Sequence, residues 1–331
     1  MSNNFTWAEI SRSALKYNLQ QFKKILDPKV QLMVVVKSNA YGHGMVEFAR
    51  LAVKYGSDWL GVVNLDEALE LREQGIRVSV LVLSYYQLDK KLLSQAIRQN
   101  ISLVAYSLEQ LNFLNRVGET AKKKVKVHLK IDTGTSRLGV LVKDALPFVD
   151  KATKFKNIKL EGIFSHFAAS EENQKFTREQ LDSFNKLIER LEKKNVKIPI
   201  KHFACSAATL VQSDSHFNLV RIGIAAYGLW PSTLTKRIVK RCYPDFNLKP
   251  VLSLYTKIVQ LKILPKGTFI GYGCTYRVTR AMRIAILPIG YFEGFDRGLS
   301  CSNVKQITKT ERSGCGVVLI SGRRFFIHYT R

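Results

Sequence analysis

The stretch VVVKSNAYGHG, residues 34–44, carries the first sign of chemistry, because three valines lead directly into Lys37. A run of valines is typical of a buried strand, so a lysine at its end lies partly out of water. There its amine can act as a nucleophile toward a carbonyl. Taken alone, Lys37 is more often a strand-end lysine that reaches solvent, and Tyr41 with Gly42 and Gly44 could simply form a turn.

Further apolar runs end on, or carry, side chains that bind or transfer charge: Arg137, His166, Ser206, Arg221, Gly223 and Ile224. Singly, a histidine such as His166 is more often structural, and Ser206 fits a helix cap. A buried Arg221 is harder to dismiss, since it needs an acceptor or an aromatic partner. Taken together, such residues at the ends of separate strands indicate a functional site more strongly than any one of them does alone.

The positions of these residues follow from eight short apolar runs that alternate with helical spacing: 32–36, 59–63, 78–83, 101–105, 125–131, 158–164, 200–205 and 219–224. Helices are expected between them, for example over 65–75, which Gly75 ends, and over 177–195. Eight such units predict an α/β fold, a (β/α)8 TIM barrel. A doubly wound open sheet is the alternative, weakened because no GxGxxG follows the first strand.

The sequence changes character after Pro231. Residues 252–267 and 271–298 resemble strands interrupted by Gly and Pro. We therefore predict two domains, a barrel over 1–240 and a β-rich C-terminal domain over 241–331.

A barrel of this kind has its active site at the C-terminal ends of the strands, where the last two loops usually bind phosphate. Ser206 and the backbone N–H groups near Gly223 are suited to that role. A nucleophilic amine facing a phosphate cradle matches pyridoxal 5'-phosphate, whose aldehyde condenses with a lysine while its phosphate anchors the other end.

The composition excludes several classes of protein. The 331 residues are 46% apolar and carry a formal charge of +26. That charge suggests nucleic acid or an anionic membrane, but the basic residues are scattered and no nucleic-acid-binding motif accompanies them. No apolar run approaches the roughly 18 residues of a membrane span, and no signal peptide is recognisable. We expect a cytoplasmic protein that binds neither membranes nor specific nucleic acid.

The cysteines and histidines indicate neither a disulfide framework nor a metal site. The five cysteines are an odd number without a CxxC pair, which is typical of reduced thiols. The six histidines lack the spacing of zinc ligands, so we expect no metal.

Together these stretches resemble the alanine racemase family, the pyridoxal-phosphate enzymes of fold type III. The resemblance covers about residues 5–300 and rests on VVKSNAYGHG, KIDTGTSRLG, FSHFA, CSAATL, VRIGIAAYG, GYGCTY and LPIGYFEGFDRG, which stand in the family's order. It implies that Lys37 binds the cofactor and acts as one catalytic base. It implies that Tyr272 is the opposite base and comes from the partner subunit of a homodimer.

The resemblance also implies roles for the other residues. Arg221 would face the pyridine nitrogen, and His166 would link it to the tyrosine base. Arg137 would lie near the substrate carboxylate, Tyr291 in the substrate entryway, and Lys130 would be a lysine that some members carbamylate. The implied phosphate contacts are Tyr41, Ser206, Gly223 and Ile224.

These roles agree with the chemistry of racemisation. A proton leaves Cα on one face and returns on the other, so two bases on opposite faces are needed. An arginine does not give up its proton, so it leaves the ring nitrogen unprotonated and the ring a weaker electron sink. Arg221 therefore favours a racemase over a decarboxylase or an aminotransferase.

The resemblance weakens after residue 300. Residues 301–315 are unfamiliar, and we expect the C-terminal domain to be incomplete or divergent. The expected function is interconversion of L- and D-alanine, which supplies D-alanine for peptidoglycan. Two alternatives stay open at this point: an inactive homologue that binds the cofactor, and a racemase for another amino acid such as serine.

Overall fold

The computed structural model describes residues 4–271, 274, 276–290, 292–294, 317–320 and 323–326. The chain forms two compact units, one of Ile10–Leu252 and the other of Met1–Glu9 with Ser253–Arg331. The domain boundary that we predict between residues 240 and 241 falls inside helix α10 (Thr233–Cys242), N-terminal to this division.

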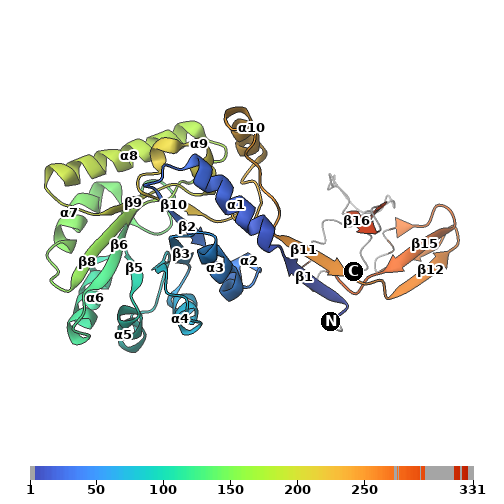
Figure 1. The fold of residues 1–331 in the computed structure, drawn as a ribbon, viewed down its shortest axis with the longest axis horizontal. Coiled ribbons are helices and arrows are strands. Elements are labelled where there is room, and N and C mark those ends of the chain that lie inside the picture. The colour runs from blue at the N-terminus through green and yellow to red at the C-terminus, as the bar shows by residue number, and fades with distance from the viewer. Residues whose placement is uncertain are drawn as a thin grey trace. The chain divides into compact units, whose positions relative to one another are not determined.

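A parallel sheet forms the centre of the first unit (Figure 1), in the order β10-β2-β3-β4-β5-β6-β8-β9. Its strands are β2 (Gln31–Val35), β3 (Trp59–Val62), β4 (Ser79–Val82), β5 (Ile101–Ala105), β6 (Val125–Asp132), β8 (Ile158–Phe164), β9 (Ile200–His202) and β10 (Leu219–Ile222), with β7 (Val140–Leu141) beside β6. Each of the eight predicted apolar runs corresponds to one main strand. The barrel prediction is confirmed.

The ring is almost closed, and few backbone hydrogen bonds join its last two strands. The N–H of Arg221 donates to the carbonyl of Ala204 at 3.0 Å, and the N–H of Asn218 donates to that of Lys201 at 3.4 Å. The sheet order joins β10 to β2 on its other side, so the ends of β9, β10 and β2 converge.

Helices lie along the outside of the sheet (Figure 1). They are α1 (Arg12–Ile25), α3 (Met45–Lys54), α4 (Leu65–Glu73), α5 (Lys90–Arg98), α6 (Leu108–Thr120), α7 (Val142–Ala152), α8 (Gln174–Lys193), α9 (Ser206–Val211), the 3₁₀ turn Ser213–Ser215 and α10 (Thr233–Cys242). Side chains of Asn64, Asp89 and Ser107 cap the N-termini of α4, α5 and α6. The helices predicted over 65–75 and 177–195 correspond to α4 and α8.

Two apolar cores stabilise the barrel unit. The larger lies between the sheet and its helices, and a smaller cluster consists of Met33, Trp59, Leu81 and Leu219. Because alternate residues of a strand point to opposite faces, Arg221 lies on the same face of β10 as Leu219. The barrel interior is therefore apolar at one level and polar at the next.

The second unit is built from short antiparallel pairs, which confirms a β-rich domain. Its strands are β1 (Thr6–Ile10), β11 (Leu252–Thr256), β12 (Gln260–Leu264), β13 (Phe269–Ile270), β14 (Tyr276–Arg277), β15 (Met282–Ile286), β16 (Val317–Ile320) and β17 (Arg323–Phe326). The pairs are β1 with β11, β12 with β15, β13 with β14 and β16 with β17. Within the described part of the chain, no helix combines the length and apolarity needed to cross a membrane.

Asn18 joins helix α1 to two later segments of the barrel unit. Its side chain is fully buried. Nδ2 donates to the carbonyls of Ala226 and Lys249, at 3.1 and 2.9 Å, and Oδ1 accepts from the N–H of Lys249 at 2.8 Å.

Replacing Asn18 with alanine should lower the free energy of unfolding by about 1–3 kcal/mol, because the buried carbonyl of Ala226 and two partly buried backbone groups of Lys249 lose their partner. Asn112 is the matched control, an exposed asparagine within helix α6. Asn112→Ala should leave stability unchanged or raise it slightly through helix propensity. Urea denaturation of both variants measures the difference, and equal stabilities would contradict this role for Asn18.

Candidate active site

Lys37 begins a turn of unusual backbone geometry, labelled α2 (Lys37–Tyr41). Ser38, Asn39, Ala40 and Tyr41 all have φ between 51° and 54°. This left-handed conformation costs about 1–2 kcal/mol for each L-residue, so the surrounding contacts must hold it. Asn39 Oδ1 accepts from the N–H of Met45 at 2.9 Å, and Glu67 Oε1 accepts from that of Ser38 at 2.6 Å.

The turn brings Tyr41 to the segment that follows β10. A Cβ atom on Gly223 would lie 3.0 Å from Tyr41 Oη, so a glycine at this position lets the tyrosine hydroxyl approach the backbone closely. The ring of Tyr41 packs edge-on against Tyr227 at 5.1 Å, and Tyr227 Oη donates to the carbonyl of Val35 at 2.9 Å. Tyr41 is therefore held through Tyr227, which is itself hydrogen-bonded to strand β2.

Ser206 meets the same segment from the start of α9. Its Oγ accepts from the N–H groups of Gly223 at 2.9 Å and Ala225 at 3.4 Å. The N–H of Gly223, which the sequence suggested for phosphate, is therefore occupied. Among the described residues no group accepts from the N–H of Ile224, which remains available. That N–H, the Ser206 hydroxyl proton and the Tyr41 hydroxyl form a cradle that suits an anion.

Arg221 is the most constrained residue of the site, with 5% of its surface exposed. Nη1 donates to His202 Nδ1 at 2.7 Å. Nη2 donates to the carbonyls of Ser165 and Phe203, at 2.7 and 2.9 Å, and lies 3.2 Å from His166 Nδ1. Within the described residues Nε has no acceptor. The N–H of Nε is therefore available for a ligand, and the second N–H of Nη1 also has no acceptor among the described residues.

Burial lowers the pKa of Arg221 to about 10, which leaves it protonated at neutral pH. Burial, followed by repulsion from Arg221, Arg137 and Lys37, lowers the pKa of Lys130 to about 8. The same cations act on His166, where burial is again the largest cause and the pKa falls to about 3. Four basic side chains close enough to repel one another suit an anionic ligand, as a phosphate ester and an amino-acid carboxylate both are.

Arg137 itself is exposed on the loop after β6, and Asp132 shapes that loop. Oδ1 of Asp132 accepts from the N–H groups of Gly134 and Thr135, both at 2.9 Å, and from that of Ser136 at 3.1 Å. Burial alone would raise the pKa of Asp132, but these hydrogen bonds outweigh it and the pKa is lowered.

Comparison with known proteins decides the family. The family model "Alanine racemase, N-terminal domain" matches residues 10–231, and "Alanine racemase, C-terminal domain" matches 251–324. The chain belongs to the alanine racemase family. The resemblance drawn from the motifs is confirmed.

Individual relatives agree with this assignment. An alanine racemase of Methanococcus maripaludis is 41% identical over 300 residues, covering 90% of this chain and 78% of the relative. The structure of alanine racemase from Bacillus anthracis with bound L-Ala-P is 31% identical, with a TM-score of 0.84, covering all of this chain and 80% of the other. The enzyme of Clostridium difficile 630 is 34% identical, with a TM-score of 0.83 over 90% of this chain and 77% of its own.

The residues predicted from the racemase motifs fall into two groups. The contacts described above bring most of them together at the C-terminal ends of the strands: Lys37, Tyr41, Lys130, Arg137, His166, Ser206, Arg221, Gly223 and Ile224. Tyr272 and Tyr291 lie outside the described residues. Their roles remain predictions.

Sequence reasoning missed His202 and Tyr227, which contact Arg221 and Tyr41 of this racemase site. His202 accepts from Arg221, and Tyr227 packs against Tyr41. A signal for His202 existed, since a buried arginine requires an acceptor and IKHFAC places a histidine in the preceding strand.

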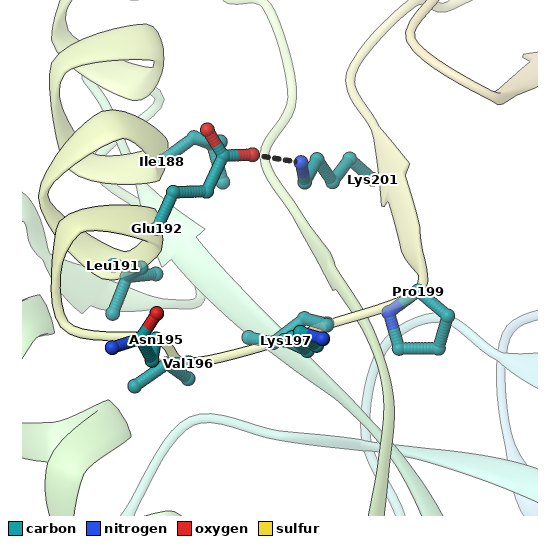
Figure 2. Close-up of a pocket in the computed structure, with 9 residues that line it drawn as sticks. Ile188, Leu191, Glu192, Asn195, Val196, Lys197, Pro199 and Lys201 are labelled. Atoms are coloured by element: carbon teal, nitrogen blue, oxygen red, sulfur yellow. Dashed lines mark hydrogen bonds and ion pairs between the residues drawn. The ribbon is translucent and has the colours of Figure 1, made fainter.

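A hollow of about 460 Å3 lies elsewhere in the racemase barrel (Figure 2). It is lined by the end of α8 and the loop to β9, from Ile188 to Lys201, where Glu192 pairs with Lys201. A loop between a helix and the next strand lies at the N-terminal ends of the strands, so this hollow is remote from the site.

His166 should make the protein more sensitive to acid. Its pKa is about 3 when folded, below the ordinary 6.5, so its contribution is complete above 6.5 and is lost as the pH falls toward 3. In His166→Gln, the slope of unfolding free energy against pH should fall between those values by up to about 1.4 kcal/mol per pH unit. Urea titrations at several pH values measure this slope, and an unchanged slope would rule out a His166 that folding keeps neutral.

Proposed function

We propose that this protein is a pyridoxal 5'-phosphate-dependent alanine racemase that interconverts L- and D-alanine. The observation that carries the proposal is Arg221, a buried guanidinium whose Nε has no acceptor among the described residues and which lies among further basic side chains. Relatives in the family are named alanine racemase. We further propose that the protein is a cytoplasmic homodimer without specific affinity for nucleic acid, and that its D-alanine serves peptidoglycan.

The cofactor fits the groups that the strand ends present. When bound, pyridoxal phosphate supplies an aldehyde carbon for an amine and a ring that draws electrons from the amino acid's Cα. Lys37 provides the amine. Tyr41, Ser206 and the N–H of Ile224 would hold the phosphate, and Gly223 lets Tyr41 approach it. Nε of Arg221 would donate to the ring nitrogen and keep its own proton, which would favour racemisation over transamination.

Two bases on opposite faces of Cα complete the mechanism. Nζ of Lys37 removes or returns the proton on one face, and Oη of Tyr272 does so on the other. We propose that Tyr272 comes from the partner subunit and that neutral His166 connects it to Arg221. Each subunit would then supply one base to the other's site.

The remaining residues handle the substrate. Arg137 attracts the alanine carboxylate, and Tyr291 lies in the entryway. The lowered pKa of Lys130, about 8, leaves part of its amine neutral, as reaction with carbon dioxide to form a carbamate requires. A carbamate would replace a positive charge by a negative one beside Arg137.

Borohydride reduction in the presence of pyridoxal phosphate should attach the cofactor to Lys37, because reduction makes the lysine linkage permanent. Lys37→Ala should lose both the label and racemisation of L-alanine, whereas Lys91→Ala, a change at an exposed lysine of α5, should keep both. Peptide mapping and a coupled D-alanine assay give the readouts. A label on another lysine with Lys37 unmodified would contradict the proposal.

Mixing two inactive variants tests the shared site. Lys37→Ala and Tyr272→Phe subunits, dissociated and reassembled in equal amounts, form hybrids with one site that holds both native bases only if Tyr272 crosses to the partner. About a quarter of the unmodified activity should return, since half of the dimers are hybrids and each has one intact site. No recovery, despite hybrids seen by native mass spectrometry, would assign both bases to one chain.

A further inference from the structure

Beyond Arg221, a row of buried polar side chains continues through the barrel, away from the proposed cofactor site. His202 Nε2 lies 2.9 Å from His128 Nδ1, and His128 Nε2 lies 3.3 Å from Glu161 Oε2. Both histidines are fully buried, and Glu161 is 7% exposed. Burying polar groups is costly unless each has a partner, so a row of this length requires a physical reason.

The direction of every hydrogen bond in the row follows from Arg221. A guanidinium can only donate, so Nδ1 of His202 must accept and its Nε2 must carry the proton. Nε2–H of His202 then donates to Nδ1 of His128, which places the second proton on Nε2 of His128. That proton is donated to Glu161, whose carboxylate accepts it. Both tautomers are thereby determined.

Glu161 ends the row at a second positive charge. Ser102 Oγ donates to Oε2, and Nζ of Lys126 lies 3.4 Å from Oε1. About a third of the Lys126 side chain is exposed, so this end of the row approaches solvent. The carboxylate therefore lies between two cations, Lys126 directly and Arg221 through two imidazoles.

The walls of the row are shaped to hold the imidazoles. The ring of His202 stacks on Phe164 at 4.5 Å with 10° between the planes, and Trp59 meets His128 edge-on at 5.5 Å. A Cβ atom on Gly162 would collide with the His128 ring, so the glycine within β8 makes room for it. Among the described residues, Lys126, Glu161 and Arg221 are the charged groups that act on the two histidines.

We propose that His202, His128 and Glu161 are positioning residues, a hydrogen-bond chain that orients the Arg221 guanidinium and supplies it with a distant carboxylate countercharge. The link to the cofactor rests on the proposed function, in which Nε of Arg221 meets the ring nitrogen. With Nη1 held by the chain and Nη2 by backbone carbonyls, the plane of the guanidinium is set and Nε points to one place.

The protonation states are those the chain needs. Burial lowers the pKa of both histidines, that of His202 well below 6.5. Burial alone would raise the pKa of Glu161, but hydrogen bonds from His128 and Ser102 outweigh it and bring the pKa to about 2. At neutral pH the chain is one arginine cation, two neutral imidazoles and one carboxylate.

The first test is made on the unmodified protein without cofactor, and substitutions serve only to assign its signals. In protein selectively labelled with 15N-histidine, the rings of His128 and His202 should both show a protonated Nε2 and an unprotonated Nδ1, unchanged from pH 6 to pH 9. Assignment uses single replacements among the six histidines. A Nδ1–H tautomer at either residue, or titration within that range, would overturn the proposed hydrogen-bond chain.

The second test separates positioning from packing. Glu161→Gln keeps an acceptor for His128 and removes the charge, so kcat should fall about 10-fold or more, with a smaller change in KM for alanine. The Arg221 15Nε resonance of the cofactor-free protein should shift, and Glu161→Asp, which keeps the charge, should recover part of both effects. Glu192→Gln is the matched control, since it removes a carboxylate paired with a lysine at the surface (Figure 2).

Each outcome decides between the explanations. A Glu161→Gln enzyme with unchanged kcat and an unchanged Arg221 resonance would reduce the row to packing. Wild-type protein that shows both predicted tautomers but racemises no alanine would overturn the proposed function, while the proposed hydrogen-bond chain would stand. The tautomer measurement on the wild type holds even if Glu161→Gln does not fold.

Discussion

Arg221 carries a positive charge into the barrel interior at the level where β9 and β10 share few backbone hydrogen bonds. Its guanidinium donates to the carbonyls of Ser165 and Phe203 and to His202, groups that follow or end β8 and β9. The side chain thus connects strands that the backbone joins only weakly. Since removing an ion from water costs several kcal/mol, these acceptors must remain in place, and the strand ends that carry them remain in place too.

The left-handed turn after Lys37 depends on the same rigidity. Four successive L-residues with positive φ persist only where the surrounding structure over-determines their conformation. The turn begins at the end of β2, which pairs with β10, and its tyrosine rests on Tyr227 from the segment after β10. One pair of neighbouring strands therefore aligns the amine of Lys37, the segment after β10 and the arginine.

The features that could be predicted from the sequence are those that depend on a single segment of the chain. Valine-rich runs gave the strands, and an arginine in an apolar run pointed to a buried charge. The left-handed turn was not predictable, since of its four residues only Asn39 is of a type that adopts this conformation readily, and Ser38, Ala40 and Tyr41 do not favour it.

The polar row behind Arg221 was equally hidden, because it depends on register between strands. Val127 pairs with Leu160 but His128 pairs with Gly162, so Glu161 is the extra residue of a bulge. No spacing within one segment reveals that a bulge turns Glu161 toward His128. For Tyr272 and Tyr291 the reverse holds. Their roles are inferred from motif resemblance alone, because both residues lie outside the described part of the chain.

The identity of residue 221 follows from the number of acceptors around it. A lysine has three donors on one rotating nitrogen, whereas a guanidinium has five N–H groups in a fixed plane. Here Nη1 donates to His202, and Nη2 donates to two carbonyls and lies beside His166, which leaves Nε for a ligand. Only a planar, permanently charged group can connect the buried carboxylate of Glu161 to the strand ends while one donor faces outward. Burying these polar groups costs stability, and this cost follows from holding the Nε–H of Arg221 in one fixed direction.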